Sequence, residues 1–149
     1  MRILGIDVGR RRLGLAISDP SGTLARPLLT VTVEREADAV DKVLVEVTRL
    51  AAEDDGLAAI VVGLPARLDG RPTTETPYAA AFVAALQART PVPVLTEDER
   101  LTSREAESRL AVGEKDWRRR KEKLDAAAAA VILQDYLDRR ASDSAGRNR

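Results

Sequence analysis

Acidic residues next to apolar runs are the side chains best placed to do chemistry in this sequence. Asp7 lies inside the run from Ile3 to Val8, where burial of an unpaired carboxylate would cost several kcal/mol. Gly9 follows and keeps the backbone uncrowded, as a phosphate or metal site would need. A carboxylate satisfied by backbone amides or by an arginine is the structural alternative, and we favour a functional role for Asp7.

Two further acidic positions follow later in the chain. Asp98 and Glu99 come after the apolar segment 92–96, and either could face a site shared with Asp7, because adjacent residues of a strand point in different directions. Asp125 opens an alanine-rich helix, whose small side chains would let it approach a sheet closely. Both positions also have a structural explanation, since negative charge is favourable near a helix N-terminus.

Composition restricts the chemistry that these acids could serve. The 149 residues include no histidine and no cysteine, which excludes disulfides, zinc sites of Cys or His ligands and Ser-His-Asp machinery. A cluster of carboxylates suits Mg²⁺ or Mn²⁺, which prefer oxygen ligands. Two such ions can activate a water and stabilise the leaving oxygen in phosphodiester hydrolysis.

Two basic runs, residues 10–12 and 117–123, lie beside these acids, although the formal net charge of the chain is zero. A charge run is often only a solvated face. These two flank Asp7 and Asp125, however, which favours contact with a phosphate backbone, and the lone Trp117 would either stack on a base or anchor its loop. The expected nucleic-acid contacts are Arg10, Arg11, Arg12, Arg100, Trp117, Arg118, Arg119, Arg120 and Lys123.

Asp19 is the acidic residue with a clear structural explanation. It begins the turn sequence Asp19-Pro20-Ser21-Gly22, in which an aspartate side chain commonly accepts hydrogen bonds from the following backbone. We therefore predict a role in the turn rather than in the site.

The elements that must position these residues follow from the apolar patterning. We predict strands at 2–8, 13–18, 24–33, 58–62 and 92–96, helices at 37–51, 78–86, 102–111 and 123–140, and loops at 66–76 and 112–121. This order predicts an α/β fold with a mixed five-stranded sheet, an antiparallel meander continued by parallel strands, and flanking helices. Ligands bind such sheets at the carboxyl ends of the strands.

The predicted organisation is one domain over residues 1–140 and a disordered polar tail over 141–149. The longest apolar stretch falls well short of the roughly 18 residues of a membrane span. The N-terminus lacks a signal-peptide layout. We therefore expect a cytoplasmic protein that does not interact with membranes.

Four stretches in this order resemble the YqgF/RuvX family, bacterial proteins related to Holliday-junction resolvases and described as pre-16S rRNA nucleases. They are Leu4-Gly5-Ile6-Asp7-Val8-Gly9 with Leu13-Gly14-Leu15-Ala16, Val61-Val62-Gly63-Leu64-Pro65 with Asp69-Gly70, Asp98-Glu99-Arg100-Leu101-Thr102-Ser103, and Lys123-Leu124-Asp125-Ala126-Ala127-Ala128-Ala129. Each stretch alone is weak evidence, whereas four in family order are specific. Two departures are Arg10-Arg11-Arg12 in place of the usual Thr/Lys stretch and Leu68 in place of the usual Met.

The resemblance implies a ribonuclease H-like fold and a nuclease that depends on Mg²⁺ or Mn²⁺. It implies an acidic triad of Asp7, Glu99 and Asp125 that acts in catalysis and holds the metal, with Asp98 in reserve because spacing does not separate it from Glu99. The implied substrate is structured RNA, and the implied role is maturation of the 5′ end of pre-16S ribosomal RNA.

Three alternatives remain from the residues themselves. The same site could resolve Holliday junctions in branched DNA, and this reaction would require a homodimer on its substrate. The chain could be a non-catalytic RNA-binding or transcription factor. The glycines around Asp7 also resemble the phosphate loop of actin-like ATPases and sugar kinases, but 149 residues leave no room for their second domain.

Overall fold

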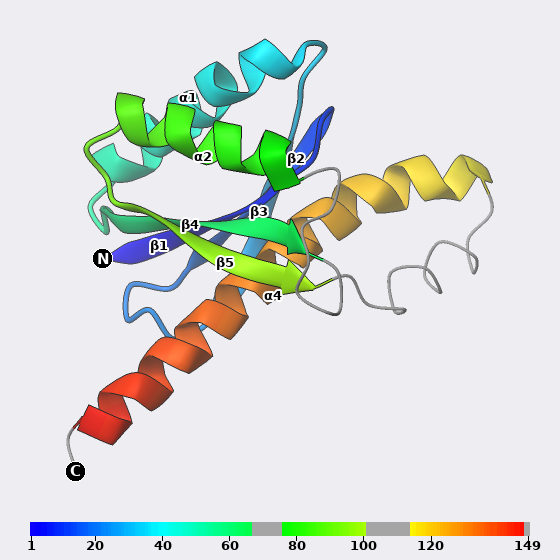
Figure 1. Cartoon of the computed structure of the whole chain (residues 1–149). Coiled ribbons are helices and arrows are strands. Elements are labelled where there is room, and N and C mark those ends of the chain that lie inside the picture. The colour runs from blue at the N-terminus through cyan, green and yellow to red at the C-terminus, as the bar shows by residue number, and fades with distance from the viewer. Residues whose placement is uncertain (67–75, 101–113, 148–149) are drawn as a thin grey trace.

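The computed structural model describes residues 1–66, 76–100 and 114–147, and Figure 1 shows their arrangement. The elements are β1 (Arg2–Val8), β2 (Arg12–Ser18), β3 (Ala25–Thr32), the 3-10 turn η1 (Glu36–Asp38), α1 (Ala39–Ala52), β4 (Leu57–Ala66), α2 (Thr76–Arg89), β5 (Val94–Arg100) and α4 (Glu114–Arg147). Among these described residues, no helix is both long and apolar enough to cross a membrane.

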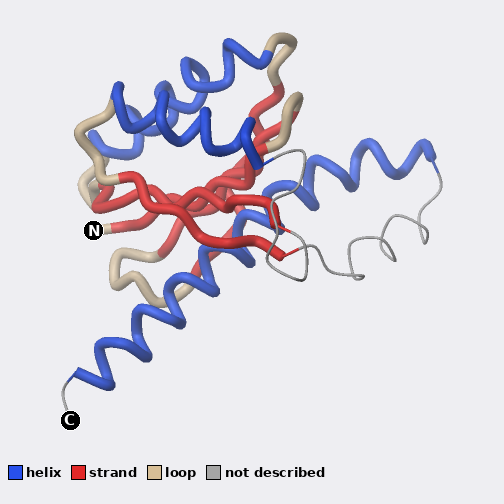
Figure 2. Tube along the Cα trace, in the orientation of Figure 1, coloured by secondary structure: helices blue, strands red, loops and turns tan. Residues whose placement is uncertain are grey.

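The strands form one five-stranded sheet in the order β3-β2-β1-β4-β5. β1, β2 and β3 pair antiparallel, and β4 and β5 continue the sheet in parallel from β1. The predicted mixed sheet is therefore confirmed. Helices α1 and α2 cover one face and α4 crosses the other, as Figures 1 and 2 show.

The two faces of β1 pack against different kinds of side chain. Leu4, Ile6 and Val8 point into a large core with α1 and α2. Ile3 belongs to a smaller cluster with α4, in which alanines are prominent. This alternation follows from the two-residue period of a strand, and it places Asp7 on the α4 face.

Close packing of α4 depends on glycine at two positions of the sheet. A Cβ atom on Gly14 would lie 1.8 Å from the carbonyl oxygen of Asp125, and one on Gly5 would lie 2.8 Å from the Cβ of Leu133. Ala126 and Ala129 are buried alanines of the helix along this contact. The prediction that small side chains would bring α4 close to the sheet is confirmed.

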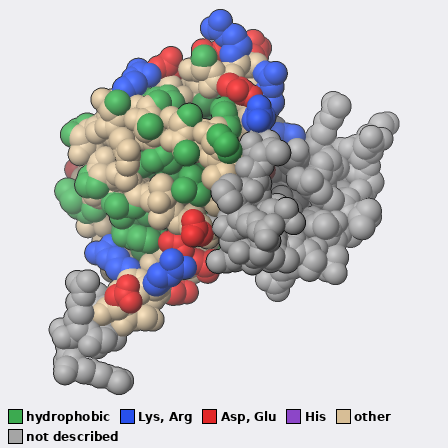
Figure 3. All heavy atoms as spheres, in the orientation of Figure 1, with side chains coloured by type: hydrophobic (Ala, Val, Ile, Leu, Met, Phe, Trp, Pro, Cys, Tyr) green, Lys and Arg blue, Asp and Glu red, His purple; other side chains and the backbone are tan. Residues whose placement is uncertain are grey.

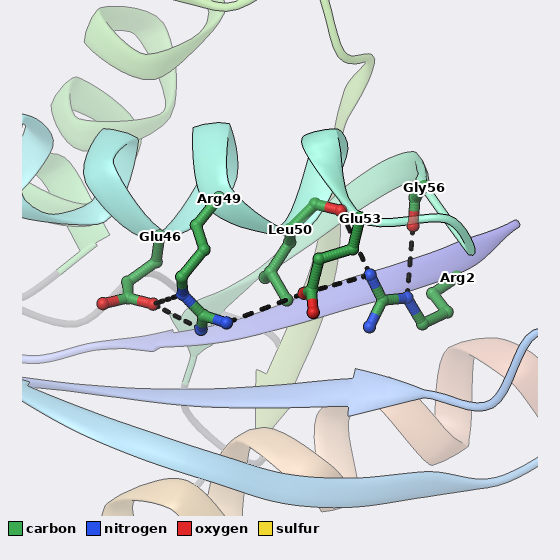
Figure 4. Close-up of polar contacts among 6 residues, drawn as sticks. All are labelled: Arg2, Glu46, Arg49, Leu50, Glu53 and Gly56. Carbon is green, nitrogen blue, oxygen red and sulfur yellow. Dashed lines mark hydrogen bonds and ion pairs between the residues drawn. The ribbon is translucent and has the colours of Figure 1, made fainter.

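Arg2 joins the start of β1 to the end of α1. Its buried guanidinium donates to the carbonyl oxygens of Leu50 at 3.1 Å and Gly56 at 3.2 Å, and it pairs with Glu53 at 3.4 Å (Figure 4). Glu53 also pairs with Arg49 at 3.6 Å. Arg2 thus adds a donor to Leu50, one of the last carbonyl groups of α1, and satisfies the carbonyl of Gly56 in the turn that follows the helix.

Several predicted element boundaries were wrong. β4 continues through the expected break at Gly63 and Pro65, because its pairing with β5 extends to Ala66. For the same reason Asp98 and Glu99 lie within β5 rather than after it. The predicted helix over 102–111 and nearly all of the loop at 66–76 lie outside the described residues.

Helix α4 is longer at both ends than the predicted range of 123–140. It begins at Glu114, so most of the expected charged loop over 112–121 is helical, and it runs to Arg147 through part of the expected tail. Arginine, lysine and glutamate are good helix formers, and no proline or glycine interrupts the chain from 114 to 145.

The turn role predicted for Asp19 is confirmed. Its Oδ1 accepts hydrogen bonds from the backbone N–H groups of Thr23 at 2.8 Å and Leu24 at 2.9 Å, and the Ser21 hydroxyl donates to its Oδ2. These bonds favour the ionised form and lower the pKa of Asp19 to about 2.

The lowered pKa of Asp19 predicts an acid-sensitive turn. Because the folded pKa lies below the ordinary value of 3.8, the contribution of Asp19 to stability is fully present above about pH 4. It is lost as the pH falls through about 2. We expect NMR amide shifts of Thr23 and Leu24 to titrate near that pH in the native protein. In Asp19→Asn this titration should be absent, and its persistence would contradict the assignment.

Substitution of Gly14 by alanine should displace α4, because the added methyl group meets backbone rather than a movable side chain. We expect the free energy of unfolding to fall by about 1–3 kcal/mol or more. Hydrogen exchange should show lost protection in α4.

Gly22→Ala is the matched control for Gly14→Ala. Gly22 has a φ of +69° and no atom near its missing Cβ, so alanine there should cost roughly 1–2 kcal/mol through backbone strain alone. Protection of α4 should stay intact in that variant. Equal loss of α4 protection in both variants would show that the close approach at Gly14 is unimportant.

Candidate active site at the carboxyl end of β1

Asp7 and Asp125 are brought to one place by Gly14. Asp7 lies next to last in β1 and pairs in register with Gly14 of β2. The missing side chain of Gly14 is where the backbone of Asp125 packs. Two predicted site residues therefore share one end and one face of the sheet although they are far apart in sequence, and both are half-buried.

Arg12 lies beside Asp125 on the same face. It precedes Gly14 by two residues in β2, so the strand alternation puts both on the α4 side. The Arg12 Nε is 3.9 Å from the Asp125 Oδ2, with 25% of the Arg12 side chain and 22% of the Asp125 side chain exposed. Sequence reasoning placed Arg12 among the nucleic-acid contacts and did not foresee this ion pair.

β5 finishes at the same end of the sheet as β1, and β4 lies between the two strands. Gly63 pairs with Asp7 on one side and with Glu97 on the other, so no side chain of β4 stands between them in the register. Glu99 pairs with Pro65, two positions further along, whereas Asp98 pairs with Leu64. The Asp98 side chain is exposed, and the Glu99 side chain lies outside what the structure describes.

The predicted triad is thus described in part. Asp7 and Asp125 come together through Gly14, and the backbone of Glu99 lies at the corresponding end of β5. Among the side chains that the structure describes, which exclude that of Glu99, no three acidic groups gather closely enough to hold a metal ion. The triad assignment stays a prediction.

Glu97 is a buried acid that sequence reasoning missed. Only 7% of its side chain is exposed, and its Oε1 pairs with the Arg139 Nη2 at 2.5 Å. Burial raises the pKa of Glu97, Arg139 opposes the rise, and Asp135 and Asp98 add to it. The sequence carried no clear signal for this burial, because Leu95, which shares the face of Glu97 in β5, is itself 39% exposed.

The three consecutive arginines have different surroundings. Arg10 pairs with Glu36 at 3.1 Å and lies over the ring of Tyr78, 5.4 Å from its centre. Arg11 is exposed, and its backbone carbonyl accepts a hydrogen bond from Val33. The run therefore includes two residues with contacts inside the protein, Arg10 and Arg12, and one that projects to solvent.

The remaining predicted nucleic-acid contacts are placed by backbone only. Arg100 ends β5, and Trp117, Arg118, Arg119, Arg120 and Lys123 lie in the part of α4 that precedes Asp125. Their side chains lie outside the described part of the chain. In the view of Figure 3, the described surface carries charges of both signs side by side rather than a large area of one sign.

Two solved structures share this fold. RuvC from T. thermophilus, in complex with a Holliday junction substrate, superimposes with a TM-score of 0.51 at 19% identity and covers 95% of this chain and 96% of its own. The fowlpox virus resolvase, in complex with Holliday junction DNA, gives a TM-score of 0.55 at 11% identity, over 93% and 97% of the two chains. The chain therefore has the ribonuclease H-like fold of the RuvC-type resolvases.

The family follows from sequence. The family model described as "RuvX: Holliday junction resolvase" matches residues 1–139. A protein of Anaeromyxobacter sp. (strain K) is 44% identical over 141 residues, which cover 95% of this chain and 99% of that protein. One of Desulforudis audaxviator is 37% identical over 148 residues, 99% of each chain. Both are named "Putative pre-16S rRNA nuclease". This chain belongs to the RuvX family of nucleases, as its motifs predicted.

The Glu97–Arg139 pair predicts an asymmetry between two variants. Arg139→Met leaves a buried carboxylate without its counterion and should lower the free energy of unfolding by about 1–3 kcal/mol at neutral pH. Glu97→Gln leaves an arginine that is 63% exposed and can be hydrated, so its effect should stay within about 1 kcal/mol.

Urea unfolding at several pH values checks this asymmetry. Burial raises the pKa of Glu97 above its ordinary value of 4.5 because it destabilises the ionised form. The cost of removing Arg139 therefore applies only while Glu97 is ionised. The difference in free energy of unfolding between Arg139→Met and the native protein should shrink as the pH falls toward 4.5. A larger loss in Glu97→Gln than in Arg139→Met would contradict this explanation.

Proposed function

We propose that this chain is a metal-dependent nuclease that cleaves phosphodiester bonds in structured RNA at the 5′ end of pre-16S ribosomal RNA. One observation carries the proposal. The contact of Asp125 with Gly14, the register partner of Asp7, puts two carboxylates at the carboxyl end of β1. The names of relatives that match almost the whole chain support the choice of substrate.

The donor chemistry at this position fits Mg²⁺ or Mn²⁺. Asp7 and Asp125 offer carboxylate oxygens, which both ions prefer, and the chain has no histidine or cysteine that would favour a softer metal. We assign Glu99 as the third ligand. Two-residue alternation gives position 99 the face of the buried Glu97, whereas Asp98 pairs with Leu64, whose side belongs to the α1 and α2 core.

When bound, the metal would lower the pKa of a water and stabilise charge on the phosphate oxygens. The other tasks fall to side chains of this chain. Asp7 and Asp125 hold the site from β1 and α4, whose relative position is fixed by backbone contact at Gly14. Arg11 projects to solvent in the hairpin that follows Asp7, where its charge can attract a substrate phosphate.

Resolution of branched DNA is the second candidate function. It is favoured by the fold shared with two resolvases bound to Holliday junctions and by the description of the family. Symmetric cleavage of a junction needs two sites, so this function predicts a homodimer on the substrate. A complex that stays one protein chain per junction in light scattering would exclude it.

Asp7→Asn should abolish nuclease activity and leave the fold intact. Loss of a metal-binding carboxylate removes several kcal/mol of transition-state stabilisation, so we expect the rate to fall by about 100-fold or more. The measurement is cleavage of labelled pre-16S RNA and of a four-way DNA junction, with Mg²⁺, with Mn²⁺ and with EDTA.

Asp41→Asn is the control for this experiment. Asp41 is an exposed acid on α1, on the opposite side of the sheet, where it pairs with Arg89. The nuclease activity of the Asp41→Asn variant should equal that of the native protein. Full activity in Asp7→Asn, or activity undiminished by EDTA, would refute the proposed chemistry.

A further inference from the structure

We propose that Arg12 couples metal binding to nucleic-acid binding. In the free protein its guanidinium pairs with Asp125; when a divalent cation takes that carboxylate, the guanidinium turns to a phosphate of the substrate. This inference rests on the proposed function, because it takes Asp125 as a metal ligand.

The geometry of the pair suits such an exchange. The Nε of Arg12 and the Oδ2 of Asp125 are 3.9 Å apart, which is an ion pair beyond hydrogen-bonding distance. About a quarter of each side chain is exposed, but the Asp125 Oδ2 that faces Arg12 is itself buried, so the attraction between the two groups is only partly screened. A tight bidentate pair would hold Asp125 more firmly and would resist displacement.

The neighbouring arginines do not share this position. Arg10 has its own contacts with Glu36 and Tyr78, on the side of η1 and α2. Arg11 lies in the bend just before β2 and is exposed. Among the described contacts of the run, it is Arg12 that pairs with a carboxylate of the site.

The charge of Arg12 has opposite effects on the two ligands. It attracts Asp125 and repels a divalent cation at the same carboxylate, so it weakens metal binding in the absence of substrate. A phosphate would give the displaced guanidinium a new partner. Metal should therefore strengthen nucleic-acid binding, and by linkage nucleic acid should strengthen metal binding to the same extent.

Arg12→Met tests this coupling in the full-length protein. Calorimetry with Mn²⁺ alone should show metal binding about five- to tenfold tighter than in the native protein. Fluorescence anisotropy with a labelled pre-16S RNA fragment should be run in EDTA and in Ca²⁺, a cation that also takes oxygen ligands. The native protein should bind the RNA more tightly with Ca²⁺, and Arg12→Met should lose most of that gain.

Arg35→Met is the matched control. Arg35 also pairs with an aspartate, Asp38, with an Nε to Oδ2 distance of 3.2 Å, but it lies at η1 and not at the site. This variant should bind Mn²⁺ and RNA as the native protein does. Thermal melts of both variants serve to check that the fold is retained.

The outcomes separate this inference from the proposed function. Weaker or unchanged Mn²⁺ binding in Arg12→Met, with clear binding to the native protein, would overturn the role of Arg12 alone. Retention of the full Ca²⁺-dependent gain in RNA binding would do the same. If the native protein does not bind Mn²⁺, or if Asp7→Asn binds it equally well, the proposed metal site itself is wrong.

Discussion

Helix α4 lies so close to β1 and β2 that backbone meets backbone at Gly14, where a single methyl group would overlap the carbonyl of Asp125. Gly5 and the buried Ala126 and Ala129 extend this contact along the helix. Each of these small residues gives up side-chain burial that a larger residue would provide. In exchange, Asp125 reaches the strand that carries Asp7, which helices separated from a sheet by bulky side chains would not allow.

The opposite face of the sheet carries the larger of the two hydrophobic cores. Leucine, isoleucine and valine from β1, β2 and β4 fill a large core beneath α1 and α2, and Arg2 ties the start of β1 to the end of α1. β1 is therefore held firmly from one side while it presents Asp7 on the other. This division explains how β1, a central strand, can carry the half-buried carboxylate of Asp7 and still keep its place in the sheet.

The sequence was sufficient where local patterning determines structure and insufficient where pairing between distant segments does. The bounds of β1 and the turn at Asp19 are local, and both were predicted. β4 and β5 were cut short because Gly63 and the acids from Glu97 onward resemble loop residues, although parallel pairing keeps them extended.

The same limit applies to the site. The alanines after Asp125 are visible in the sequence and indicated that this helix could approach the sheet, whereas Gly9 near Asp7 was interpreted as room for a phosphate or metal. Partners of the charged groups are not visible, because Arg12 and Asp125, or Glu97 and Arg139, meet only in the folded chain. The zero net charge follows from 24 basic and 24 acidic residues, and some of these are held against each other in the folded chain. The proposed function requires binding of both a cation and a polyanion, and such pairing has a physical use there. Carboxylates alone would repel phosphate and arginines alone would repel metal, whereas paired groups can be separated by the two ligands together.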